Sequence, residues 1–171
     1  MLRILGIFVV IAGSSGCAYS IVRERGEYLD RCRQWLELFE LMENEIAFQK
    51  SSLPEICARV GSRLSGNRKL FLDGIGQAFR DGGDTLGEVW RRETRRILAQ
   101  EPMSREVERE LEELGEKLCF EDGGMQSKML SDMERYLGKH LREQESLNRD
   151  KNKLTLCAGV MGGLLLTILL I

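Results

Sequence analysis

The residue of this sequence best suited to acid–base chemistry is its single histidine, His140. An imidazole titrates near neutral pH and can act as a general base when a carboxylate orients it. The nearest carboxylates along the chain, Glu143 and Glu145, lie on a highly charged predicted helix, where such groups usually form a solvated face. We therefore interpret His140 as a partly buried structural side chain. We predict no catalytic residue and no enzymatic activity.

Other candidate chemistry is equally sparse. The Gly74-Ile75-Gly76 segment lacks the third glycine of a dinucleotide-binding motif and the GK[ST] ending of a phosphate-binding loop. The cysteines contain no CxxC pair, which indicates neither a zinc site nor a disulfide framework. They are Cys17, Cys32, Cys57, Cys119 and Cys157. We predict no metal, no cofactor and no small-molecule substrate.

Charge is distributed very unevenly along the 171 residues. Residues Ile4 to Val22 and Leu154 to Ile171 contain no ionised side chain, whereas the segment between them carries every aspartate and glutamate. About 18 to 20 apolar residues in a helix cover the hydrocarbon core of a bilayer. We therefore predict an N-terminal transmembrane segment over residues 1–22, a helical domain over 23–153 and a C-terminal transmembrane segment over 154–171.

The central segment is close to neutral, with every basic residue except Arg3 and all 27 acidic residues. Such a surface does not suit phosphate binding, so we predict no nucleic-acid partner. Basic residues adjoin the inner ends of both uncharged stretches, and lysine and arginine accumulate on the cytoplasmic side of membranes. They are Arg23, Arg25, Arg31, Arg33, Arg142, Arg149, Lys151 and Lys153. We predict an integral membrane protein whose helical domain faces the cytoplasm.

An alternative interpretation concerns the N-terminus. Arg3, an apolar run and then Ser14-Ser15-Gly16-Cys17 resemble a lipoprotein signal peptide, whose cleavage would leave an extracytoplasmic lipoprotein helical interaction module anchored at Cys17. Against this interpretation, Ser14 stands three positions before the cysteine, where such a signal normally has an aliphatic residue. Apolar residues also continue beyond Cys17, so an uncleaved span is favoured.

Apolar residues recur at spacings of three and four through the central segment, which is the pattern of amphipathic helices. The first stripe follows the N-terminal span without a breaker, so one helix is predicted to about Phe48. Ser52 and Glu55 then form a helix-start signal. The first stripe consists of Leu29, Cys32, Leu36, Phe39, Met42 and Ile46; later stripes run from Ile56 to Leu64, Leu70 to Phe79, Leu86 to Leu98, Val107 to Leu118 after a cap at Ser104, and from near Met125 into the C-terminal span.

The fold class that follows is all-α. No segment alternates with a period of two or is rich enough in β-branched and aromatic residues to be a strand. About 130 residues in six helices can enclose one core. We predict a six-helix bundle soluble domain flanked by N- and C-terminal transmembrane helices.

Opposite charges concentrate in the hairpin of the fourth and fifth predicted helices. Four arginines lie on the fourth helix and six glutamates on the fifth. Internal neutralisation on a solvated surface is one interpretation, and a candidate partner-docking surface is the other; we give the second less weight. The residues are Arg91, Arg92, Arg95 and Arg96, opposite Glu106, Glu108, Glu110, Glu112, Glu113 and Glu116.

The C-terminal span contains small residues at a spacing that allows close helix packing in lipid. Gly159 and Gly163 are four residues apart, and the first span offers Gly13 and Gly16. Glycines at this spacing let two helices approach closely. Gly159 and Gly163 are therefore candidate transmembrane packing residues, either between the two spans of this chain or with other membrane proteins.

Three segments of the chain resemble the stage III sporulation protein AB family of endospore-forming bacteria, and the resemblance extends over essentially the whole chain. They are Ser52-Leu53-Pro54-Glu55, Leu114-Gly115-Glu116-Lys117-Leu118 followed by Asp122 and Gln126, and Ala158-Gly159-Val160-Met161-Gly162-Gly163-Leu164-Leu165-Leu166. The family often has a glycine directly after the leucine that is Leu118 here, and this chain has Cys119 instead. The helix is therefore expected to end differently from its relatives.

The resemblance implies a component of the channel-like complex that links mother cell and forespore. It also implies a domain similar to the cytoplasmic helical domains of type II secretion F-type platform proteins, which contact a motor ATPase. By this analogy the chain is expected to act as a scaffold on the mother cell side. It would recruit or couple a sporulation ATPase, together with other membrane proteins of the complex, without hydrolysing nucleotide itself.

Overall fold

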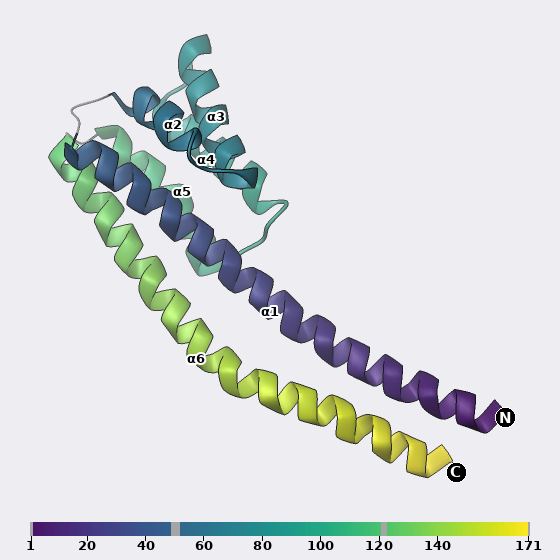
Figure 1. Cartoon of the computed structure of the whole chain (residues 1–171). Helices are drawn as coiled ribbons and strands as arrows, with labels where there is room; N and C mark the ends of the chain where they lie inside the picture. The colour runs from purple at the N-terminus through teal and green to yellow at the C-terminus, as the bar shows by residue number, and fades with distance from the viewer. Residues whose placement is uncertain (1, 49–51, 121–122, 171) are drawn as a thin grey trace. The chain divides into compact units, whose positions relative to one another are not determined.

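The computed structural model describes residues 2–48, 52–120 and 123–170, and these ranges are almost entirely helical (Figure 1). The predicted all-α fold with six helices is confirmed, and the described residues contain no strand. The helices are α1 (Leu2–Phe48), α2 (Leu53–Gly61), α3 (Gly66–Asp81), α4 (Leu86–Leu98), α5 (Arg105–Phe120) and α6 (Gly123–Leu170).

The helix starts follow from local hydrogen bonding. The backbone N–H of Ser52 donates to the Glu55 carboxylate at 3.1 Å, as the helix-start signal predicts. The Ser104 hydroxyl accepts from the Val107 N–H at 3.4 Å and caps α5. Helix α3 begins earlier than the stripe from Leu70 predicts, at Gly66, whose φ of 61° is a conformation that glycine adopts without strain.

The chain forms two compact units, which we call the helical unit (residues 31–140) and the terminal unit (residues 1–30 with 141–171). In the helical unit, α2 packs against α3, α3 against α4, and α4 against α5. The C-terminal part of α1 adds the aromatic side chains described next. The first part of α6 contributes Leu130, Met133 and Leu137 to the buried apolar set.

Four aromatic rings form the centre of the helical unit. Trp35 and Phe39 of α1 contact Phe71 of α3 and Trp90 of α4, and all four side chains are buried. The Trp35 and Phe71 rings are 5.2 Å apart edge to face, and the Phe71 and Trp90 rings are 5.0 Å apart in the same arrangement. The predicted stripe on α1 was wrong at one position. It included Leu36, which is only half-buried, and omitted Trp35, which is buried.

In the terminal unit, one arginine joins the first part of α1 to the last part of α6. Arg25 donates through Nη1 to the Asn152 side-chain oxygen at 3.0 Å and to the Thr155 hydroxyl at 3.3 Å. Ala18 and Asn148 are buried in the same unit. Within the ranges that the structure describes, no helix is both long enough and apolar enough to cross a membrane. The two predicted transmembrane helices are therefore unconfirmed.

Candidate functional site

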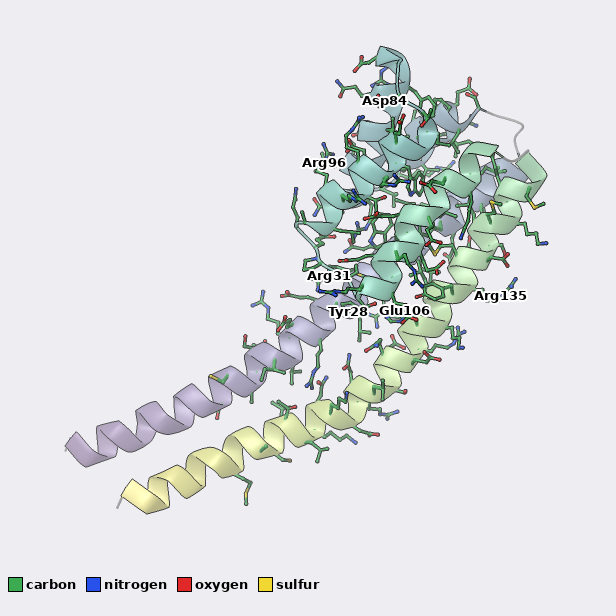
Figure 2. All side chains as sticks on the ribbon, turned by 180° about the vertical axis from the view of Figure 1, so that it is seen from behind. Tyr28, Arg31, Asp84, Arg96, Glu106 and Arg135 are labelled. Carbon is green, nitrogen blue, oxygen red and sulfur yellow. The ribbon has the colours of Figure 1, made fainter. Side chains whose placement is uncertain are left out.

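The arginine row, which we define as Arg91, Arg92, Arg95 and Arg96, lies along α4 and is paired with acidic groups of the same chain. Two members reach α5 as predicted: Arg91 pairs with Glu116, and Arg95 forms a two-pronged contact with Glu112 at 3.0 and 2.8 Å. The other two have partners that the charge pattern did not predict. Figure 2 labels Arg96, the last member of the row, and Asp84, which precedes α4.

Arg92 pairs with Asp84, just before α4, at 2.5 Å. Arg96 pairs with Glu93 on its own helix at 3.0 Å and also donates to the backbone oxygen of Leu70 at 3.1 Å. The four arginine side chains keep between 41% and 65% of their surface exposed. Exposed ion pairs contribute about 0–1 kcal/mol each, so a partner that offers new carboxylates can replace them at little cost.

The other residues singled out from the sequence belong to α1 and α6, whereas the arginine row belongs to α4. Gly159 and Gly163 lie on α6, and their surroundings are outside the described part of the chain. Cys17 is exposed on α1, which continues through this position without interruption. His140 is half-buried, and its ring stacks on Tyr136 with centroids 6.4 Å apart.

Among the described residues, the cysteines and carboxylates form no metal-binding group. Cys32 and Cys57 are buried, and burial raises the pKa of the Cys57 thiol to about 12, so this sulfur stays protonated and inert. Within the described ranges, no three histidine, cysteine or acidic side chains are arranged to hold a metal ion. The absence of a cofactor and of catalysis stays a prediction.

A buried charge on α3 was not predicted from the sequence. Arg68 is buried to 99%, and its Nη2 donates to Glu101, beyond the end of α4, at 2.5 Å. Asn67 donates to the other oxygen of the same carboxylate at 2.7 Å. The guanidinium also lies 4.2 Å from the centre of the Trp35 ring, a cation–π contact. Burial lowers the pKa of Arg68, and the negative charge of Glu101 opposes this shift.

A second unforeseen feature joins α6 to α1. Burial raises the pKa of the Glu134 carboxyl to about 7, and the negative charges of Glu43 and Glu40 on α1 contribute. One Glu134 oxygen is buried without a hydrogen-bond partner among the described residues. Glu43 itself accepts a hydrogen bond from the Ser127 hydroxyl of α6 at 2.7 Å. The contact between these helices therefore includes a carboxyl that is easily protonated.

We expect the stability of the chain to fall as the pH rises toward 7 because of Glu134. Its pKa is higher in the folded chain than the ordinary value of 4.5, so the stabilisation is complete below about pH 4.5 and is lost through about pH 7. The group is only partly buried, so water screens the charges and the loss should be about 1 kcal/mol. Glu134→Gln should remove this slope in urea unfolding measured at several pH values.

The variant Glu40→Gln provides the matched comparison. It removes one of the two neighbouring charges and should move the fall in stability to lower pH without abolishing it. An unchanged pH profile for Glu134→Gln would contradict the assignment of the slope to this carboxyl.

Comparison with known proteins places this helical arrangement in a family. The sequence matches the family model of stage III sporulation protein AB over residues 3–171. The chain belongs to the stage III sporulation protein AB family. It is therefore a sporulation protein, as the resemblance of the three segments predicted.

A solved structure of a stage III sporulation protein AB has a similar fold. The TM-score is 0.64 at 16% sequence identity, and the similarity covers 72% of this chain and 97% of that one. At this identity the likeness concerns the fold alone, and it agrees with the six-helix, all-α arrangement. A search among curated protein sequences found no relative of this chain.

Proposed function

We propose that the chain is a membrane-anchored platform of the mother cell–forespore channel complex, and that its helical unit recruits or couples a motor ATPase on the cytoplasmic side. The observation that carries this proposal is the extent of the family match. Because it runs from residue 3 to residue 171, the uncharged ends belong to the family pattern and are not additions to it. The ATPase partner comes from the resemblance to platform proteins.

Membrane anchoring is supported by the uncharged stretches and by the contact of Arg25. This side chain follows the first stretch closely, and its partners Asn152 and Thr155 adjoin the start of the second. The inner ends of both stretches therefore lie close together, as two antiparallel spans crossing one bilayer require. A reporter inserted at Gly82-Gly83 should remain cytoplasmic. Extracytoplasmic labelling would instead favour the lipoprotein anchored at Cys17.

The arginine row is the surface that we assign to the partner. Its side chains are exposed and planar, so they can bind carboxylates of a second protein in a two-pronged manner. Their internal pairs are weak enough to be replaced. The same pairs also make the row part of the α4–α5 contact, so an experiment must separate docking from internal support.

Exchanging the charges of one pair makes this separation. Arg95→Glu should reduce retention of the purified ATPase by the solubilised full-length chain about tenfold, because one arginine–carboxylate contact is worth about 1.4 kcal/mol. The double variant Arg95→Glu/Glu112→Arg restores the internal pair but leaves a negative charge in the row. If the row docks the partner, the double variant should fold normally and still lose retention. Recovered retention would show that Arg95 acts only within the chain.

A further inference from the structure

The terminal unit brings together basic side chains that come from both of its helices. Arg25 of α1 donates to Asn152 and Thr155 of α6, so these parts of the two helices lie at one level. Further basic residues stand within about one turn of this contact on α6. We call the basic side chains at this level the cation cluster, which consists of Arg25, Arg149, Lys151 and Lys153.

The charge of the cation cluster is not neutralised by ion pairs. Within the described ranges, none of its members pairs with a carboxylate, whereas the neighbouring Arg23 pairs with Glu27 at 2.8 Å. Two further carboxylates, Glu24 and Asp150, stand in the same stretches and are exposed. Two residues along a helix correspond to about 200° of rotation, so Asp150 lies on the side of α6 opposite to Asn152 and the contact with α1. A positive excess therefore remains where the two helices meet.

All members of the cation cluster can be reached by a ligand. The three side chains on α6 are exposed, and Arg25 is half-buried. Both hydrogen bonds of Arg25 use its Nη1, and its Nε and Nη2 groups are neither buried nor bonded to another described residue. A guanidinium has five N–H donors. An acceptor outside the chain can therefore bind Arg25 without breaking the contact between the helices.

Large apolar side chains are exposed directly beside the cation cluster. Leu154 follows Lys153 and has 70% of its surface exposed, whereas the buried residues of this unit include the polar Asn148. Helices that pack together in water show the opposite distribution, with apolar side chains in the contact. The outer surface of the helix pair is thus both cationic and apolar. The exposed large apolar residues of the terminal unit are Tyr19, Ile21, Leu147, Leu154, Leu156 and Met161.

This combination of charge and apolar surface identifies the class of ligand. A nucleic acid or an acidic protein segment would neutralise the cations but leave the apolar side chains in water. An anionic phospholipid satisfies both, because its phosphate accepts hydrogen bonds from arginine and lysine while its acyl chains cover the apolar side chains. The headgroup of a zwitterionic lipid carries a cation of its own, which the positive excess repels.

We propose that the cation cluster binds the phosphate of an anionic phospholipid. Arg25 is the donor held between the two helices, and the basic residues of α6 surround the bound phosphate. The inference rests on the membrane anchoring in the proposed function and deepens it, because it gives the anchor a preference for one class of lipid. The bound lipid would also add a contact that joins α1 to α6.

The test is native mass spectrometry of the full-length chain in a neutral detergent. The probes are phosphatidylglycerol and phosphatidylcholine with identical acyl chains, and an excess of inorganic phosphate serves as competitor. We expect phosphatidylglycerol to bind at least about tenfold more tightly than phosphatidylcholine, because only the first carries a net negative charge. Inorganic phosphate should not displace it, since the phosphate ion has no acyl chains to cover the apolar surface.

Two matched double variants locate the site. Lys151→Gln/Lys153→Gln should weaken binding of phosphatidylglycerol about 25-fold, because each basic residue near an anionic lipid contributes about fivefold. Lys69→Gln/Lys128→Gln removes the same charge from exposed positions of the helical unit and should leave binding unchanged. Arg25→Gln should also weaken binding, and if this variant does not fold, the two double variants still decide.

Equal affinity for the two lipids, displacement by inorganic phosphate, or equal effects of the two double variants would each overturn the proposal. Such a failure leaves membrane anchoring standing, because the reporter at Gly82-Gly83 tests anchoring without regard to the class of lipid. Extracytoplasmic labelling of that reporter would instead overturn the proposed topology, while the lipid affinities measured in detergent would still stand.

Discussion

Replacing Glu101 with alanine should destabilise the helical unit by about 3 kcal/mol, the typical cost of leaving one member of a buried ion pair alone. The Arg68 side chain has 2% of its surface exposed and would lose its hydrogen-bonded carboxylate. Asn67 would lose its acceptor at the same time. Urea unfolding of the full-length chain, followed by circular dichroism in the far-ultraviolet band of helices, measures the change.

Two further variants isolate the cause. The double change Arg68→Met/Glu101→Ala removes both charges and should recover most of the lost stability, because a buried pair is worth little more than apolar residues of similar volume. Glu112→Ala breaks the exposed pair with Arg95 and should cost less than about 1 kcal/mol. If Glu101→Ala and Glu112→Ala lowered the free energy of unfolding equally, burial of Arg68 would not be the cause of the effect.

Gly115→Ala should destabilise the chain by roughly 2 kcal/mol, although alanine normally favours a helix over glycine. A Cβ atom at this position would overlap the Trp90 ring, which packs directly on the α5 backbone. The ring has little room to move, because it is fully buried and its indole N–H donates to the Leu111 oxygen at 2.8 Å. The overlap should therefore outweigh the gain of about 1 kcal/mol from helix propensity.

The control is a helical glycine with open space around it. Apart from the backbone of its own helix turn, Gly26 on α1 has no atom within 4 Å of the position that a Cβ would occupy. Gly26→Ala should leave stability unchanged or raise it by up to about 1 kcal/mol in the same unfolding measurement. If Gly115→Ala behaves like Gly26→Ala, close contact with Trp90 is not the reason for a glycine in α5.

The helices could be predicted because their signals are local. The spacing of apolar residues and the caps at Ser52 and Ser104 act within a few residues, and α4 matches its stripe from Leu86 to Leu98. It is harder to predict which residues of a helix face the core, because this depends on the helices that pack against it. Trp35 is buried because its ring packs against Phe71 of α3 as well as Phe39 of its own helix, and the sequence of α1 alone does not reveal the contact with α3.

The candidate sites depended on long-range contacts and were predicted less well. Opposite charges on consecutive helices indicated the pairs of Arg91 and Arg95, but not that Arg92 would pair with Asp84. Arg68 resembled any surface arginine, because its partner Glu101 lies 33 residues away along the chain. Gly115 stood in a segment that carried the family resemblance, yet only Trp90 explains the need for glycine there.

The central rings also give the protein an optical probe of its own. The chain has two tryptophans, Trp35 and Trp90, and both belong to the same four-ring cluster. Tryptophan fluorescence of the whole chain, excited selectively over tyrosine, therefore arises from one location. Any event that separates α1, α3 and α4 exposes these rings to water and should shift the emission to longer wavelength. The measurement applies to the protein in detergent, in vesicles or bound to its partners, and no dye needs to be attached.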